Sequence, residues 1–238
     1  MTRAADFRAM HRAPPLLVLP NAWDVASARA LAGLPGCRAL ATSSAAVARS
    51  LGWEDGEQTP VGEMLRVVER IAAAVDLPVT ADLEAGYGDP PGTAAAALAA
   101  GAAGMNLEDS RAGELLPVEE QLAILRAVRS AAPELVVNTR VDVFVSGDGD
   151  PAAAIERGNA YLAAGADCVY PIAAPLELAG ALAAGIDGPV NILVPAGDPP
   201  LAELERAGVA RVSFGSGLAR AALDHAARLA AEALAAGP

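Results

Sequence analysis

"PVTADLEAGYGDPPGTAAAALAAGAAGMNLEDS" (residues 78–110) places two short β-rich runs on either side of an alanine-rich stretch. The runs are "PVTADLE" at 78–84 and "GMNLEDS" at 104–110. The stretch between them has the composition of a helix and ends in Ala-Gly, as a helix closed by a C-terminal glycine does. The order strand, helix, strand is the repeating unit of a parallel sheet.

The same unit recurs along the chain. β-rich runs occupy residues 16–20, 37–44, 78–84, 104–110, 135–142, 168–173, 189–194 and 210–215. Helical stretches separate these runs, and several of them end in Ala-Gly directly before the next run. Eight alternating strands and helices predict an α/β fold, a (β/α)8 TIM barrel. A doubly wound open sheet is the alternative, but the turn after the first run, "LPNAWD", lacks the glycines of a dinucleotide-binding loop.

Length, composition and charge limit the function. A chain of 238 residues with 53% hydrophobic content can bury one large core, so we expect a single domain over residues 1–238. The formal net charge of -12 disfavours nucleic acid or an anionic membrane as a partner, because phosphate groups would be repelled. The N-terminal "MTRAADFRAMHRAPP" lacks the apolar segment of a secretory signal. We therefore expect a cytoplasmic protein that binds a small molecule.

Missing residue types exclude several chemistries. All 17 basic residues are arginine, which excludes a Schiff-base aldolase, a pyridoxal phosphate enzyme and a P-loop. His11 and His225 lie outside the predicted strands, so we expect no catalytic role for either. Cys37 and Cys168 begin their predicted strands, at the end opposite to an active site, and are expected to act as small buried hydrophobic residues.

Polar residues gather at the C-terminal ends of the second to fifth predicted strands, where barrel enzymes carry their active sites. They are Thr42, Ser43, Ser44, Asp82, Glu84, Asn106, Glu108, Asp109, Asn138, Arg140 and Asp142. The loop after the second strand adds Glu54, Asp55 and Glu57. The sequence therefore predicts an acidic site that contains one arginine from a strand.

Three of these acids indicate a metal site. Side chains alternate along a strand, so Asp82 and Glu84 are expected on the same face. Carboxylates crowded into one cavity raise each other's pKa unless a cation lies between them. Asp82, Glu84 and Glu108 offer only oxygen donors, the set that Mg²⁺ or Mn²⁺ prefers. The alternative is that these acids cap helices or pair with arginines in the loops.

Further polar groups have open roles. The planar guanidinium of Arg140 suits a carboxylate or a developing enolate oxygen. Asp109 and Asp142 could support the site or be purely structural. "FGSGLAR" at 214–220 could bind a phosphate at the start of the last helix, or its glycines could simply form a tight turn.

Five motifs, in this order and spacing, resemble the isocitrate lyase and phosphoenolpyruvate mutase superfamily over nearly the whole chain. They are "PNAWDVASARAL", "TSSAAVARSLGWEDGE", "ADLEAGYGD", "GMNLEDS" and "NTRVDVF". The resemblance implies a Mg²⁺-dependent α/β barrel that makes or breaks a C–C or P–C bond next to the carboxylate of an enolpyruvate or a related 2-oxo acid.

The resemblance also implies roles for individual residues. Asp82 would bind the metal directly, and Glu84 and Glu108 would hold it mostly through waters. Ser43 and the backbone amide of Ser44 would bind the carboxylate of the keto acid.

The remaining candidates concern the reacting part of the substrate. The resemblance implies that Arg140 steadies an enolate and that Asp55 lies close to the reacting group. Tyr87 is a candidate for proton transfer, alongside a carboxylate or a metal-bound water. Trp23, in "PNAWD", and Asn106, at the end of the fourth strand, are candidates for substrate binding.

The chain departs from the family pattern in five places. Two of them are "YPIA" late in the sixth strand, where related members carry a histidine, and "TRVD" in the fifth, which keeps Arg140 but lacks the usual threonine. Lyase members carry a Lys-Cys-Gly-His signature on a loop after the fourth strand, where this chain reads "EDSRAGELLPVEEQ", so isocitrate and methylisocitrate lyase activities are disfavoured. The usual Asp-x-Asp is Asp82-x-Glu84 here. One helix follows the eighth strand, whereas relatives often add another that exchanges between subunits; we still expect a homo-oligomer, a dimer or a tetramer.

These features predict a Mg²⁺-dependent lyase or C–C bond hydrolase that acts through an enolate. Its substrate would be a small 2-oxo or 2-hydroxy dicarboxylate, cleaved to release pyruvate, oxalate or a similar fragment. An enzyme that forms or cleaves a P–C bond is the second hypothesis, favoured by Asp55 and disfavoured by the scarcity of basic groups. A non-catalytic relative that binds a metal and a keto acid is the third, and a sugar-phosphate barrel enzyme is a further alternative.

Overall fold

All eight predicted strands are present in the computed structural model, which describes residues 3–12, 14–197 and 199–236. They are β1 (Leu17–Leu19) with its continuation β2 (Asn21–Ala22), β3 (Leu40–Thr42), β4 (Val79–Asp82), β5 (Gly104–Leu107), β8 (Val136–Val141), β9 (Cys168–Pro171), β10 (Asn191–Leu193) and β11 (Arg211–Ser213). Most of them are shorter than their predicted ranges, because the end residues already belong to loops.

The strands form a closed parallel barrel. β2, β3, β4, β5, β8 and β9 pair in that order, and β1, β11 and β10 form a second ladder. A parallel bridge between Val169 and Val190 joins the two ladders on one side, and β1 continues into β2 through Pro20 on the other. Proline has no N–H to donate to a ladder, which explains the break in the first strand. The predicted (β/α)8 barrel is confirmed.

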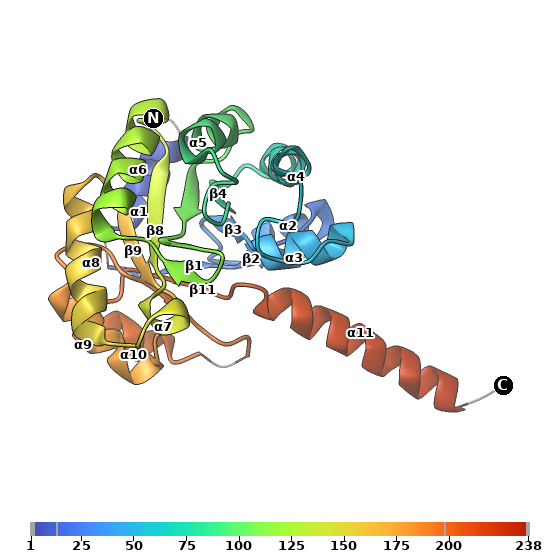
Figure 1. Ribbon diagram of the computed structural model, residues 1–238. Coiled ribbons are helices and arrows are strands. Elements are labelled where there is room, and N and C mark those ends of the chain that lie inside the picture. Colours follow the sequence, from blue (N-terminus) through green and yellow to red (C-terminus); the bar gives the residue numbers. More distant parts are fainter. Residues whose placement is uncertain (1–2, 13, 198, 237–238) are drawn as a thin grey trace.

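Helices surround the barrel (Figure 1). Those between the strands are α2 (Val25–Ala32), α3 (Ser44–Leu51), α4 (Val61–Ala74), α5 (Pro90–Ala99), α6 (Val118–Ala131), α8 (Pro151–Ala163), α9 (Ala179–Gly185) and α10 (Leu201–Arg206). Shorter elements are α7 (Val143–Ser146), η1 (Leu176–Leu178) and an antiparallel hairpin of β6 (Ser110–Arg111) and β7 (Glu114–Leu115). The hairpin occupies the position where the sequence lacks the lyase signature.

The N-terminal helix α1 (Arg3–Met10), which was not predicted, packs at one end of the barrel. Its Phe7 is fully buried and forms an apolar cluster with Leu17, Leu19 and Val136 from the start of the strands. Polar side chains occupy the opposite end, where the strands finish. The polar residues predicted to form the site therefore lie at the C-terminal end of the barrel.

The last helix, α11 (Gly217–Ala236), extends away from the barrel (Figure 1). Ala219 is its only buried residue. Leu223, Leu229 and Leu234 are 67%, 50% and 83% exposed. No helix among the described residues is both long and apolar enough to cross a bilayer.

Two details of the sequence interpretation were wrong. β4 ends at Asp82, and Glu84 lies in the following turn with a φ of 51°, so strand alternation does not relate these two side chains. Cys37 is half-buried in a turn before β3, where its Sγ donates to the carbonyl of Ala39, whereas Cys168 is the buried first residue of β9 as expected.

Candidate active site

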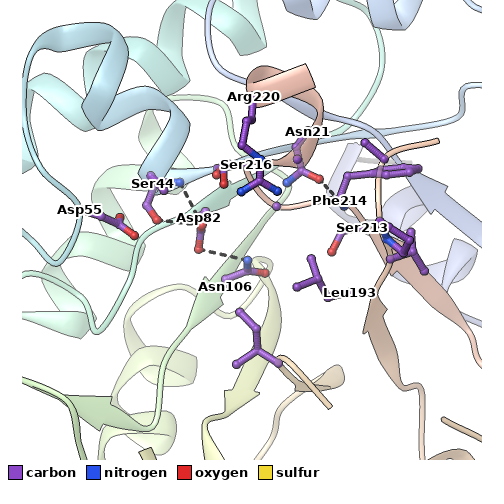
Figure 2. Close-up of a pocket in the computed structure, with 18 of the residues that line it drawn as sticks. Asn21, Ser44, Asp55, Asp82, Asn106, Leu193, Ser213, Phe214, Ser216 and Arg220 are labelled. Atoms are coloured by element: carbon purple, nitrogen blue, oxygen red, sulfur yellow. Dashed lines mark hydrogen bonds between the residues drawn. The ribbon is translucent and has the colours of Figure 1, made fainter. Parts of the chain in front are cut away.

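A cavity of about 640 Å³ opens at the C-terminal ends of the strands (Figure 2). Six of the predicted residues line it: Ser43, Ser44, Asp55, Asp82, Asn106 and Arg140. The rest of the lining includes Tyr170, Ile172, Leu193, Val194, Ser213, Phe214, Ser216 and Arg220. The polar ends of β3, β4, β5 and β8 thus converge on one cavity, as the barrel prediction required.

Asp82 lies between two groups of hydrogen-bond donors. Ser44 opens α3, and its backbone N–H and Oγ both donate to Asp82 Oδ2, at 2.9 and 3.0 Å. Asn106 Nδ2 donates to Asp82 Oδ1 at 3.2 Å. The N-terminal end of a helix carries a partial positive charge, so α3 stabilises the carboxylate at this position. Ser43 is the N-cap of the same helix and accepts from the N–H of Ala46 at 3.4 Å.

Arg140 is held in a fixed orientation by acids on two sides. Its Nε and Nη2 donate to the two oxygens of Asp142, at 2.9 and 2.8 Å, and its Nη1 pairs with Glu108. Burial opposes the charge of Arg140, but Glu108 and Asp142 outweigh burial and raise the pKa of the guanidinium. The paired planar contact with Asp142 fixes the plane of the guanidinium. Asp142 therefore supports the site.

Asp142 and Asp109 are themselves locked in place. Ser110 Oγ donates to Asp142 Oδ2 at 2.5 Å. Asp109 accepts from the backbone N–H of Asp142 at 2.7 Å, from the hydroxyl of Tyr161 at 2.8 Å and from Arg157 at 3.1 Å. Both acids are completely buried. Asp109 thus holds the turn that follows β8 and does not face the cavity.

Glu84 and Tyr87 join two loops. The carboxylate of Glu84 accepts from the hydroxyl of Tyr87 at 2.8 Å and from the backbone N–H of Glu57 at 2.6 Å. The N–H of Tyr87 donates in turn to the carboxylate of Glu57 at 2.5 Å. Burial is the main cause that raises the pKa of Glu84, and burial and Glu84 raise the pKa of Tyr87. These contacts tie the loop that carries Asp55 to the turn after β4.

Glu108 is the acid most affected by its surroundings. Its pKa is raised to about 9, chiefly by burial; Arg140 opposes this shift, and Asp142, Asp82 and Glu84 add to it. The neighbouring acids are therefore close enough to disfavour the charged form of Glu108. A bound cation would relieve this repulsion.

The barrel resembles the structures of known proteins. The chain matches the phosphoenolpyruvate phosphomutase family over residues 7–234. It belongs to the phosphoenolpyruvate mutase and isocitrate lyase superfamily. Within this superfamily, an uncharacterized protein of Mycobacterium tuberculosis strain H37Rv is 37% identical over 214 residues, which are 89% of this chain and 82% of that protein.

Two solved structures of the superfamily show the same fold. A protein from Burkholderia cenocepacia J2315 shares 43% identity with a TM-score of 0.90, covering 96% of this chain and 98% of that one. 2,3-Dimethylmalate lyase shares 25% identity with a TM-score of 0.86, covering 100% of this chain and 86% of that one.

Members of the superfamily typically use Mg²⁺. Among the residues that the structure describes, no group of three or more His, Cys, Asp or Glu side chains is placed to ligate one ion directly. Asp82 faces the cavity, and Glu84 and Glu108 repel one another and Asp82. This all-oxygen set with excess negative charge fits a hydrated divalent cation that keeps most of its waters and takes few direct ligands.

Other predicted residues lie away from the cavity. Trp23 lines a separate groove of about 330 Å³ between α2, α3 and α4, with Leu51, Val67 and Arg70 among its neighbours. Tyr87, Glu84 and Glu108 are not among the residues that line the cavity. His225 is exposed on α11.

Arg220 and Asn21 are among the cavity residues that the sequence interpretation missed. Arg220 reaches from α11 toward the cavity (Figure 2), and no acid in the described part of the chain pairs with it. It belongs to "FGSGLAR", for which the sequence suggests only a tight turn or a phosphate-binding loop. Asn21, in the "PNAWD" motif, donates to the carbonyl of Thr42 at 2.7 Å and accepts from the N–H of Phe214 at 2.7 Å, which joins the first and last strands at the cavity.

Proposed function

We propose that this protein is a Mg²⁺-dependent lyase or C–C bond hydrolase that cleaves a small 2-oxo or 2-hydroxy dicarboxylate through an enolate. One observation carries the proposal: Arg140, fixed by Asp142, faces the same cavity as Asp82 and the N-terminal end of α3. This places a rigid cation and a helix N-terminus on one side of the cavity and a carboxylate for a metal beside them.

In this proposal each residue at the cavity has a separate role in binding or catalysis. Ser43 and the backbone N–H of Ser44, at the start of α3, would bind a substrate carboxylate, for which the Ser44 N–H must exchange its bond to Asp82. Arg140 donates to the oxygen that becomes negative as the bond breaks. Asp55, which lines the cavity, lies on the substrate side and is available to move a proton. Tyr87 holds Glu84 in place and does not reach the cavity in this arrangement.

The cofactor in this proposal is Mg²⁺ or Mn²⁺, which Asp82 would hold together with Glu84 and Glu108. A bound divalent ion supplies positive charge that stabilises an enolate oxygen. The name 2,3-dimethylmalate lyase denotes a substrate of the class proposed here, a 2-hydroxy dicarboxylate.

A P–C bond enzyme is the second candidate, and Arg220 favours it. This guanidinium, together with the start of α11, adds donors for a second anionic group to the lining of the cavity. A phosphonate or a second carboxylate would both suit these donors. The choice between them depends on which ligand the cavity prefers.

The decisive experiment is a thermal-shift screen with oxalate, oxaloacetate, substituted malates and phosphonopyruvate, with and without Mg²⁺, followed by an assay for product release. We expect Mg²⁺-linked stabilisation by oxalate and turnover of at least one dicarboxylate. Asp82→Asn should abolish the Mg²⁺-linked shift, because it removes the charge and keeps the shape. Asp76→Asn, at the exposed entrance to β4 on the other end of the barrel, is the matched control.

Other outcomes select the alternatives. Stabilisation by phosphonopyruvate alone would favour P–C chemistry. Ligand binding without turnover of any compound would favour a non-catalytic binding protein. The proposal would be contradicted if none of the ligands shifted the melting temperature, with or without Mg²⁺.

We also propose that the protein self-associates through α11. A helix with one buried residue and three exposed leucines gains little from its own barrel. Isolated helices are marginally stable in water, so a second copy that covers these leucines would stabilise the helix.

A further inference from the structure

Arg211 is the largest fully buried side chain of the described residues. It is the first residue of β11, and its side chain lies inside the barrel, below the cavity. Its guanidinium contacts His11 from the end of α1, the ring of Phe7 at 5.9 Å from the centroid, and Asn106 on β5. Arg211 thus connects the apolar end of the barrel with the residues under the site.

The charge of Arg211 has no acid partner within ion-pair distance in the described ranges. Arg129, Arg140 and Arg157, which are also partly buried, each pair with an aspartate. Nε of Arg211 has no hydrogen-bond partner at all. Burying an unpaired cation is costly, so packing alone does not account for arginine at this position.

His11 holds the guanidinium from below. His11 Nδ1 lies 2.9 Å from the carbonyl of Phe7, to which it donates, so Nε2 carries the lone pair that accepts from Arg211 Nη1 at 3.4 Å. Burial and the nearby charge of Arg211 lower the pKa of His11 to about 4, so the ring is neutral at neutral pH. A neutral ring accepts from the arginine without repelling it.

Asn106 connects Arg211 to the site. Its Oδ1 accepts from Arg211 Nη2 at 3.4 Å and from Asn138 Nδ2 at 2.8 Å. Two donors at the oxygen require the amide nitrogen to face the other way, toward Asp82, where it donates at 3.2 Å. The reversed amide would place an oxygen against the carboxylate of Asp82.

We propose that Arg211 is a positioning residue: it fixes the side-chain amide of Asn106, which in turn fixes the carboxylate of Asp82 toward the cavity. The inference rests on the proposed function, because it assigns Asp82 its orientation for binding. Arg211 itself does not touch a ligand. Its effect passes through Asn106.

A double-mutant cycle tests the proposal. The probe is oxalate with Mg²⁺, and its dissociation constant is measured by titration calorimetry for Arg211→Met, Asn106→Ala and the double variant. We expect Arg211→Met to weaken binding roughly tenfold, as loss of a residue that orients a ligand-binding group does. In the Asn106→Ala background it should have no further effect. Arg228→Met, on the exposed face of α11, is the control and should bind like the wild type.

Thermal stability separates positioning from a structural role. Replacing a buried charge by an apolar side chain of similar length is often neutral or stabilising, so Arg211→Met should melt no lower than the wild type while it binds oxalate more weakly. Equal losses in both backgrounds, or a lower melting temperature with unchanged binding, would overturn the proposal. Arg211→Lys, which keeps the charge but loses the planar group, serves if Arg211→Met does not fold, and it should weaken binding in the same way.

A ligand-free crystal structure of the variant gives a second, independent readout. We expect the amide of Asn106 to turn and its contact with Asp82 to be lost. An unchanged contact would overturn the inference. This measurement does not require oxalate to bind, so it remains decisive if the wild type fails to bind oxalate and the proposed function falls.

Discussion

His11 is buried at the end of the barrel opposite to the cavity, and its ring is neutral there at neutral pH. Burial is the largest cause of its low pKa, which is about 4 compared with 6.5 for an unperturbed histidine. The unfolded chain takes up a proton as the pH falls below 6.5, whereas the folded chain resists until about pH 4. Folding stability contributed by His11 is therefore complete above pH 6.5 and is lost as the pH falls through this window.

Substitution of His11 should remove this pH dependence. Between pH 7.5 and 4.5 we expect the wild type to lose about 2 kcal/mol more unfolding free energy than His11→Gln, which has no titrating group there. Urea unfolding at the two pH values measures the difference. His225→Gln, on the exposed surface of α11, is the control and should follow the wild type. Parallel losses in wild type and His11→Gln would contradict the assignment.

Individual site residues could be predicted only in part. Asp82 and Arg140 follow from their places at strand ends, because closure of a barrel brings those ends together. The role of Arg211 could not be predicted, since it lies near the start of its strand and acts through a neighbour distant in sequence. Trp23 was expected to bind substrate from its motif alone, and the structure places it in another groove.

At the scale of elements, the turn after β4, which carries Glu84, contains two glycines with a positive φ. Gly86 has a φ of +95°, and a Cβ there would lie 2.6 Å from Cα of Pro90 at the start of α5. Gly88, two residues later, also has a positive φ of +77° but has open space around it. A substitution at Gly88 therefore tests backbone strain alone, whereas a substitution at Gly86 tests backbone strain together with a steric clash.

Alanine substitutions at these positions should differ in cost. Both Gly86→Ala and Gly88→Ala pay for a left-handed backbone, roughly 1–2 kcal/mol. We expect Gly86→Ala to cost at least about 1 kcal/mol more, because α5 must shift to admit the methyl group. Urea unfolding measures both free energies, and equal values would show that the turn relaxes without moving the helix.

Element order was predictable, but element ends were not. The eight strands follow from the alternation of β-rich and helical stretches. The end of β4 at Asp82 could not be predicted. The alternating pattern of the sequence continues through residue 84, but the positive φ of Glu84 takes that residue out of the strand.

At the scale of the whole molecule, most of α11 extends away from the barrel (Figure 1). Its 20 residues would extend about 30 Å, with one buried residue to hold them. Self-association would make the melting temperature depend on protein concentration.

Removing the exposed leucines should disrupt assembly. We expect the wild type to be a dimer or a tetramer by size-exclusion chromatography with light scattering. Leu223→Gln/Leu229→Gln/Leu234→Gln should shift it toward the monomer, because the apolar area that a second copy would cover is lost. Leu34→Gln, 52% exposed elsewhere on the surface, should leave the mass unchanged. A monomeric wild type would contradict self-association through this helix.

The sequence by itself determined the barrel and the strand ends that meet at the cavity, because both follow from local periodicity and from the direction of parallel strands. Only the tertiary structure decided that Arg140 pairs with Asp142 and Glu108, that Arg220 faces the cavity, and that Arg211 lies unpaired beneath it. These relations join residues from separate strands and helices. Their distances and desolvation depend on how the closed barrel packs, which no local pattern encodes.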